Sequence, residues 1–176
     1  MNKQLFIKDK YFNKNFFEPI CNLKLHSRPD GGLWTADYNE DFGSTWLQTM
    51  TFEQQNGSIL EVKPEAKILS IHTIEDAFGI FPDYLICNSI PASKNANGIE
   101  TSLGVYEFDF EKMAQTYDAI SVSREVTNGD DQYNGQFSPF ADWGIASTLW
   151  FNTNHLELVK ELTTEQLKKM RMNTIY

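Results

Sequence analysis

The sequence predicts an α+β domain, in which short strands and short helices follow one another without the regular strand–helix–strand rhythm of a parallel sheet. Three observations carry this prediction. The chain has 176 residues, the length of a single domain. Hydrophobic residues make up 41% and aromatic residues 14%, which is sufficient for a packed core and excludes a disordered chain. Helix-capping side chains alternate along the chain with short segments that are rich in β-branched and aromatic residues.

Four helices are predicted, each from a side chain that can cap its first turn. The capping residues are Ser44, Thr73, Asp109 and Thr163. Thr73 with Asp76, and Thr163 with Gln166, have the spacing of capping boxes, in which two residues satisfy each other's backbone groups. The predicted helices span 44–56, 73–80, 109–117 and 163–172, and Gly57 is the stop signal of the first.

Seven strands are predicted, and 67–72 and 147–152 are the strongest because β-branched and aromatic residues dominate them. Pro64-Glu65, between two of the strands, predicts a tight antiparallel connection. The complete set is 23–26, 33–36, 58–63, 67–72, 119–123, 147–152 and 156–160. Residues 94–98 and 127–136 are polar and rich in turn formers, so they are predicted as exposed loops.

The net charge of −9 excludes two classes of partner. An acidic surface repels phosphate backbones and anionic lipid headgroups, so neither non-specific nucleic-acid binding nor docking on a membrane is expected. Two interpretations of the charge stay open. The chain is either an ordinary acidic enzyme or an acidic protein that occupies a basic site on a partner protein.

Cysteine and histidine usage argues against disulfides and against a bound metal. Cys21 and Cys87 are the only cysteines, and the N-terminal residues carry lysines where a secretory signal has an apolar segment. We therefore expect reduced thiols and a cytoplasmic location. No apolar run approaches the length of about 18 residues that a membrane span needs. The three histidines are far apart and no known zinc motif is present, so no protein-bound zinc is expected.

Residues 26–36, HSRPDGGLWTA, gather several residue types of functional interest in one short stretch. Pro29 fixes φ at the first position of a turn, and Gly31 accepts a positive φ. The stretch therefore predicts a hairpin that joins strands 23–26 and 33–36, with Trp34 in the core.

A ligand site is the alternative for the same stretch. Gly31 and Gly32 have no side chains, so a ligand can approach the backbone closely at these positions. His26 and Arg28 then flank that ligand, and the guanidinium group of Arg28 suits a phosphate. We expect the stretch to form one wall of a ligand cleft in addition to its turn.

Two later stretches carry polar residues beside aromatic ones, and each has a structural explanation. In 117–123, Asp118 is placed to bond backbone amides where a helix meets a strand. In 141–159, Asn152 and Asn154 are typical turn residues, and His155 fits a surface or capping histidine better than a catalyst.

Taken together, the three stretches resemble ADP-ribosyltransferase-like domains of bacteria and phages. Those domains carry K/R-P-x-G-G-L-W near the N-terminus, Y-D-G-I-x-V after a helix, and a closing strand that ends F-N-P. The matches here are Arg28-Pro29-Asp30-Gly31-Gly32-Leu33-Trp34, Tyr117-Asp118-Ala119-Ile120-Ser121-Val122 and Trp150-Phe151-Asn152-Thr153. They occur in the same order and span residues 23–160.

The resemblance implies split antiparallel sheets with short flanking helices, and a cleft between them that holds NAD. In such a protein the nicotinamide–ribose bond breaks through an oxocarbenium-like state, and a protein side chain or a nucleotide base captures the ribose. Arg28 or His26 is implied to hold the phosphate or ribose of NAD, and Trp34 to pack near the nicotinamide. The complete set of implied NAD-binding residues is His26, Arg28, Gly31, Gly32, Trp34 and Tyr117.

One part of the family pattern is missing. An acidic residue at the start of the closing strand normally holds a ribose hydroxyl and spreads the positive charge. This sequence has Gly144, Ile145, Ala146 and Ser147 there, and Ala119 replaces the usual glycine. The nearest acids are Asp142, Glu125 and Asp131. The candidate catalytic residues are therefore Asp142, Glu125 and Ser147, unless the carboxylate role is filled by no residue.

Two functions follow from these observations. The first is an NAD-dependent ADP-ribosyltransferase, of phage or bacterial type, that modifies a protein or nucleotide target. The second is a non-catalytic acidic protein on the same fold, which blocks a host defence protein or sequesters a nucleotide. The missing acid, the charge of −9 and the many aromatic residues motivate the second. A plain interaction domain with an accidental resemblance is the remaining interpretation.

Overall fold

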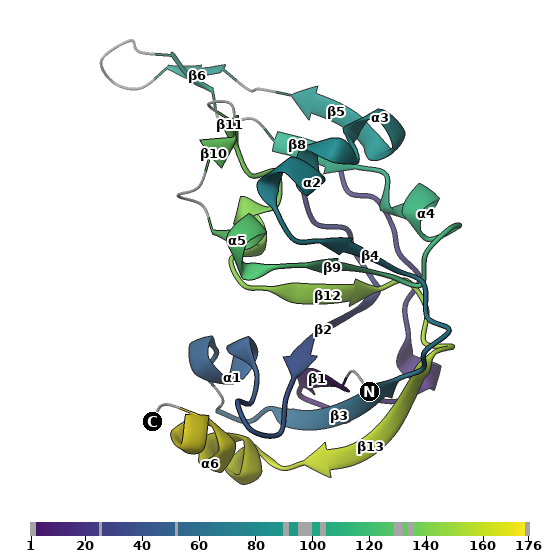
Figure 1. Cartoon of the computed structure of the whole chain (residues 1–176), viewed down its shortest axis with the longest axis vertical. Coiled ribbons are helices and arrows are strands. Elements are labelled where there is room, and N and C mark those ends of the chain that lie inside the picture. Colours follow the sequence, from purple (N-terminus) through teal and green to yellow (C-terminus); the bar gives the residue numbers. More distant parts are fainter. Residues whose placement is uncertain are drawn as a thin grey trace.

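The computed structural model describes residues 3–24, 26–51, 53–89, 92–94, 100–102, 105–128, 132–133 and 136–174. These residues form a bent sheet of seven strands with helices packed against it, which confirms the predicted α+β class (Figure 1). Across the sheet the strands are β13 (Leu156–Leu162), β3 (Asn56–Val62), β1 (Lys3–Lys8), β2 (Leu33–Tyr38), β12 (Ser147–Trp150), β9 (Ala119–Val122) and β4 (Ile68–Ile71).

The remaining elements are short. Three two-stranded pairs join β5 (Leu85–Ser89) to β8 (Val105–Phe108), β6 (Ala92–Lys94) to β7 (Glu100–Ser102), and β10 (Gln132–Tyr133) to β11 (Gln136–Phe137). The α-helices are α1 (Thr45–Thr49), α2 (Ile74–Gly79), α3 (Phe81–Tyr84), α4 (Phe110–Met113), α5 (Arg124–Thr127) and α6 (Thr164–Thr174). Two 3₁₀ turns, η1 (Lys14–Phe16) and η2 (Ala141–Trp143), complete the described chain.

Strand β2 divides the sheet into two halves because it changes its partner along its length. Residues 33–35 pair with β12 and residues 36–38 pair with β1, antiparallel in both cases. The first half-sheet therefore contains β13, β3, β1 and the end of β2, and the second contains the start of β2 with β12, β9 and β4. Figure 1 shows the halves as two facing layers with β2 between them. The strands are antiparallel throughout, except that β4 and β9 are parallel.

The apolar core occupies three places around the two half-sheets. Between them, Leu60 of β3 and Trp150 of β12 are both fully buried. Over the outer face of the second half-sheet, the rings of Phe108 and Phe140 stack with their centroids 4.8 Å apart. Over the first half-sheet, α1 and α6 pack on β1 and β3. Polar residues line the opening where β2 leaves β12.

The predicted helix caps are confirmed. They were predictable because a cap depends only on residues that are close to it in the sequence. Ser44, Thr73 and Asp109 each accept a hydrogen bond from a backbone amide in the first turn of α1, α2 and α4. Thr163 and Gln166 make the predicted reciprocal pair at the start of α6.

Helix α1 is shorter than predicted, and Gly57 does not stop it. The helix ends at Thr49, and Gly57 lies inside β3, where Leu167 of α6 packs against its backbone. A Cβ atom on Gly57 would come within 2.8 Å of a methyl group of Leu167. The glycine therefore serves a close helix-to-strand contact, a role that the sequence does not distinguish from a stop signal. The helix predicted at 109–117 is also shorter, because the chain beyond Met113 continues as a hydrogen-bonded turn.

Two predicted strand pairings are wrong. Residues 23–26 are not a strand where they are described; they lie in a loop closed by an isolated bridge between Cys21 and Asp30, so the predicted hairpin does not form. Strands β3 and β4 do not pair across Pro64-Glu65, because they belong to different half-sheets and β4 pairs with β9. Both predictions assumed that neighbours in sequence pair with each other, whereas the split sheet places distant segments side by side.

Strand β1 is central in the first half-sheet, and the sequence patterns did not indicate it. Lysines begin and end it, and its four inner residues are all buried, so it lacks the alternation of a half-exposed strand. Of the predicted loop 94–98, only Lys94 is described. Of the predicted loop 127–136, residues 129–131, which include Asp131, and residues 134–135 lie outside the described chain.

The capping box of α2 gives the fold a pH-dependent contribution to stability. The backbone amide of Thr73, and next that of His72, donate to the Asp76 carboxylate and hold its pKa below the usual value. A carboxyl whose pKa is lowered by folding stabilises the native state above its unfolded pKa, and this contribution disappears as the pH falls through the lowered value. We expect Asp76→Ala to lower the unfolding free energy by about 1 kcal/mol at pH 7, and by less at about pH 3.

Urea unfolding of the wild type and the variant at both pH values measures this difference. Glu75→Ala is the matched control, because Glu75 is an exposed acid in the same first turn. An equal loss of stability at both pH values contradicts the assignment to the ionised Asp76.

Candidate functional site

A polar groove opens where β2 leaves β12 to pair with β1. It consists of three neighbouring hollows of about 440, 430 and 220 Å³, and Thr45 at the start of α1 contributes to the lining of all three. The first lies between the turn at 39–43 and α1, the second between α1 and α5, and the third between β2, β9 and β12. We call them together the central groove. Figure 1 shows α1 and α5, which both line it, at the side of the molecule where β9 ends and β12 begins.

Hydroxyl groups line the deep end of the central groove because several strands end there. The parallel strands β4 and β9 both finish at this side, followed by His72 and Ser123, and the Ser123 hydroxyl donates to the His72 carbonyl at 2.6 Å. Two residues before Ser123, the Ser121 hydroxyl of β9 accepts a hydrogen bond from Thr148 of β12 at 3.1 Å. The strand ends of the second half-sheet thus present a row of hydrogen-bonding groups.

A tight turn holds an aromatic ring at the outer end of the central groove. Asn39 and Gly43 form an isolated antiparallel bridge, and the Asn39 side chain accepts from the Asp41 and Phe42 amides. Gly43 adopts a φ of 71°, which favours glycine. Phe42 lines the first hollow and is 76% exposed, although a large apolar side chain gains by burial. An exposed ring beside a polar hollow is a platform for a flat ligand group.

Charged side chains of both signs line the central groove. Arg124 at the start of α5 lines the second and third hollows, and no carboxylate of the described residues lies within ion-pair distance of it. Asp37 of β2 lines the first and third hollows. Lys3 also lines the first hollow, but a hydrogen bond to Glu40 engages it and raises its pKa. Arg124 is therefore the cation that the groove offers to an anionic ligand.

Ser147 and Glu125, two of the predicted catalytic residues, are near the central groove but do not supply a free reactive group. The Ser147 hydroxyl is buried, accepts from the Trp46 indole at 3.1 Å and donates to the Ile145 carbonyl at 2.9 Å. Glu125 is exposed on α5 and lines none of the three hollows. The Ser147 hydroxyl therefore links α1 to β12 through its hydrogen bond with Trp46.

Asp142, the third predicted catalytic residue, meets the loop that contains His26 and Arg28. The Ser27 hydroxyl donates to the exposed Asp142 carboxylate, and the Trp143 indole donates to the Ser27 carbonyl at 3.4 Å. Ser27 is buried, whereas His26 and Arg28 on either side of it are exposed. The structure thus brings these predicted residues together, but none of them lines the central groove.

Gly31 and Gly32 allow a close approach of the chain to itself. Both have positive φ, of 74° and 68°. A Cβ atom on Gly31 would lie 2.1 Å from the Pro19 carbonyl oxygen, and the Gly32 amide donates to the Glu18 carbonyl at 2.8 Å. Segment 18–20 therefore occupies the space beside both glycines, which accounts for them without a ligand.

Trp34 and Tyr117, the remaining predicted NAD-binding residues, lie elsewhere. Trp34 packs edge-on against Trp143 at 4.6 Å and, with Gly32, lines a separate hollow of about 460 Å³ beside the aromatic residues of 6–17. Tyr117 packs on the core over the second half-sheet, just before β9 begins. The central groove is at the other end of β9, so Tyr117 does not belong to it.

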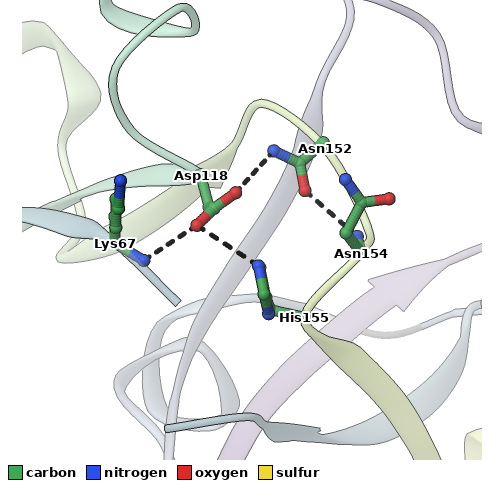
Figure 2. Close-up of polar contacts among 5 residues, drawn as sticks. All are labelled: Lys67, Asp118, Asn152, Asn154 and His155. Atoms are coloured by element: carbon green, nitrogen blue, oxygen red, sulfur yellow. Dashed lines mark hydrogen bonds and ion pairs between the residues drawn. The ribbon is translucent and has the colours of Figure 1, made fainter. Parts of the chain in front are cut away.

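Asp118 ties together three segments at the end of the sheet opposite the central groove (Figure 2). Its carboxylate accepts from the Lys67 amide and from the Asn152 side chain, each at 2.8 Å, and lies 3.6 Å from Nε2 of His155. Asn152 in turn accepts from the Asn154 amide at 3.0 Å. Asp118 does bond a backbone amide as predicted, but that amide is 51 residues away in sequence. The cluster therefore has the form of a structural joint.

Sequence reasoning missed Asp37, Phe42, Thr45 and Arg124, and only part of their signal is visible in the sequence. Asp37 lies one residue beyond the strand predicted at 33–36, and Arg124 directly follows the strand predicted at 119–123. Polar residues just after a strand are placed at a sheet edge, which is the usable signal. Their convergence depends on which strands are neighbours.

Comparisons with known proteins neither support nor contradict the resemblance to ADP-ribosyltransferase-like domains. A scan against protein-family models, a search of curated proteins and a search of solved structures each find no match to this chain. Among the described residues, none of the helices combines the length and apolar character needed to cross a membrane. In the same part of the chain, no three His, Cys, Asp or Glu side chains are grouped so as to hold a metal ion.

Proposed function

We propose that this chain is an ADP-ribosyltransferase-like protein that binds NAD in the central groove. The observation that supports this most is the position of the groove. It opens between two half-sheets and reaches Ala146 and Ser147 at the start of β12, where the resemblance implies the reacting end of NAD. Each of the two larger hollows is within the range of about 300–1,000 Å³ that small-molecule sites occupy.

The chemistry of the lining suits a dinucleotide. The Arg124 guanidinium offers paired donors with the geometry of a phosphate, so it is assigned to the pyrophosphate. The exposed ring of Phe42 is assigned to the nicotinamide or the adenine, because every such base has a face that stacks on an aromatic ring. The hydroxyl-lined third hollow is left for a ribose.

In the transferase form of this proposal, the bond between ribose C1′ and the nicotinamide nitrogen breaks, and its electron pair leaves with the nicotinamide. A nucleophile of the protein or nucleotide target then bonds to C1′ and releases its proton. The positive charge that develops on the ribose requires a nearby carboxylate, an electrostatic contribution that is worth about 3 kcal/mol or more.

A non-catalytic binding protein is the second candidate, and the start of β12 favours it. Ala146 has no acidic group, the Ser147 hydroxyl is engaged with Trp46, and Asp142 is engaged with Ser27 outside the groove. In this form the protein sequesters the dinucleotide, or uses its acidic surface to block a host protein.

Calorimetric titration of the purified protein with NAD, with nicotinamide release followed in the same sample, tests the proposal. Saturable binding is expected. Binding with release of nicotinamide identifies the transferase, and binding without release identifies the non-catalytic form. The absence of any binding heat or turnover contradicts NAD binding in either form and leaves only the blocking of a host protein by the acidic surface.

A further inference from the structure

Asp37 lines the same hollow as Ala146 and Ser147, where the acidic residue is missing. Strands β2 and β12 are antiparallel, and Thr35 pairs with Thr148. Two residues beyond this pair, Asp37 of β2 pairs with Gln4 of β1, and Ala146 directly precedes β12. Asp37 and Ala146 both line the third hollow, at the point where β2 turns away from β12 toward β1. The carboxylate that β12 lacks is therefore present on the neighbouring strand.

A chain of buried hydrogen bonds orients the Asp37 carboxylate. The Trp150 indole donates to the Thr35 hydroxyl at 3.0 Å, and that hydroxyl donates to Oε1 of Gln4 at 2.7 Å. Nε2 of Gln4 then donates to Oδ1 of Asp37 at 2.5 Å. Trp150 and Thr35 are 0% exposed and Gln4 is 3% exposed, so these side chains have little freedom to move.

The same chain of bonds leaves one oxygen of Asp37 available. Among the described residues, Gln4 alone donates a hydrogen bond to this carboxylate, and the accepting atom is Oδ1. Asp37 is the exposed member of the chain and the one that lines the central groove. An ionised carboxylate only accepts hydrogen bonds, so its natural partners are ligand hydroxyls.

We infer that Asp37 is the carboxylate of the central groove and accepts hydrogen bonds from ribose hydroxyls of the bound dinucleotide. The inference rests on the proposed binding of NAD. Charge determines the order of the ligand along the groove, because a carboxylate repels phosphate and Arg124 attracts it. The pyrophosphate therefore lies at Arg124, and a ribose lies between β2 and β12 at Asp37.

Asp37→Asn is the informative variant, because the asparagine side-chain oxygen can still accept from Gln4 while the charge is lost. Asp41→Asn is the matched control, since Asp41 is an exposed acid on the neighbouring turn and does not line the third hollow. Calorimetric dissociation constants are measured for NAD and for two NAD analogues, each lacking the 2′-hydroxyl of one ribose.

The wild type is expected to bind one of the two analogues about tenfold more weakly than NAD. Asp37→Asn is expected to bind NAD about tenfold more weakly than the wild type, and to bind NAD and that analogue equally. Asp41→Asn keeps the wild-type values. If Asp37 contacts a ribose, the variant binds NAD and that analogue with equal affinity. If Asp37 has only a structural role, the variant binds all ligands more weakly by the same factor.

Two results overturn the inference and leave the proposed function standing. One is unchanged NAD binding by Asp37→Asn, and the other is weaker binding with the wild-type discrimination between NAD and its analogues. A wild-type protein that binds no NAD overturns the proposed function itself, and the inference with it.

Discussion

Replacing Gly31 with alanine is expected to lower the unfolding free energy by about 3 kcal/mol, which at this chain length lowers Tm by about 10 °C. Two physical effects add. The φ of 74° places an alanine in the left-handed region, and its Cβ atom would lie 2.1 Å from the Pro19 carbonyl oxygen. Backbone cannot move away as a flexible side chain can, so segment 18–20 must shift and the hydrogen bond between Gly32 and Glu18 is lost.

Gly144→Ala is the matched control for this prediction. Gly144 has a φ of 70°, but no other atom lies within 4 Å of the position where its Cβ would be. Its replacement therefore measures the conformational effect alone, about 1 kcal/mol. Thermal unfolding of both variants gives the comparison. Equal losses in the two variants would show that segment 18–20 does not press on Gly31, and would return the two glycines to the ligand interpretation.

Asp118→Ala is expected to have a destabilising effect of similar size, about 3 kcal/mol. The side chain is 16% exposed and its two oxygens satisfy donors from Lys67 and Asn152. Removing the acceptor leaves both donors unpaired at the joint between β4, β9 and the turn after β12. Hydrogen bonds to a charged group are worth more than neutral ones, which is the reason for the large expected loss.

His155→Ala tests whether the ion pair or the amide contacts dominate this cluster. The contact between His155 and Asp118 is 3.6 Å long and partly exposed, and Nδ1 of His155 is buried without a hydrogen-bond partner among the described residues. We expect a loss of about 1 kcal/mol or less, measured by urea unfolding. If Asp118→Ala left stability unchanged and abolished turnover of NAD, the cluster would be a reaction centre and the structural assignment would be wrong.

Local features of this chain were predictable from the sequence, and long-range pairings were not. The capping residues Ser44, Thr73 and Asp109 act within their own helix turn, so their sequence spacing was enough. The partners of β2 were not predictable, because half of this strand pairs with β1 and half with β12. Turn residues and hydrophobic patterns describe a strand, whereas its neighbours depend on packing between segments far apart in sequence.

The candidate site shows the same division between local and long-range information. The stretch around Arg28 indicates a site because unusual residues are adjacent in the sequence, yet Gly31 lies against the Pro19 backbone and Gly32 against Ile20 and Leu149. Asp37 and Arg124 are separated by 87 positions and line the same hollow only because β2, β12 and β9 are adjacent strands. Once the strand order is known, each follows from its place at a strand end.

If NAD binds in the central groove through Arg124, two arginine variants are expected to differ in their affinity for NAD. Calorimetric titration with NAD compares the wild type with Arg124→Ala and Arg28→Ala. The first variant removes a guanidinium group from the groove, and the second removes one from the exposed loop outside it. We expect Arg124→Ala to weaken NAD binding by about 10–100-fold and Arg28→Ala to leave the dissociation constant within about twofold of the wild-type value. If Arg28→Ala lost NAD binding and Arg124→Ala kept the wild-type affinity, Arg124 would not hold the pyrophosphate and the nucleotide would lie beside the loop at 26–28.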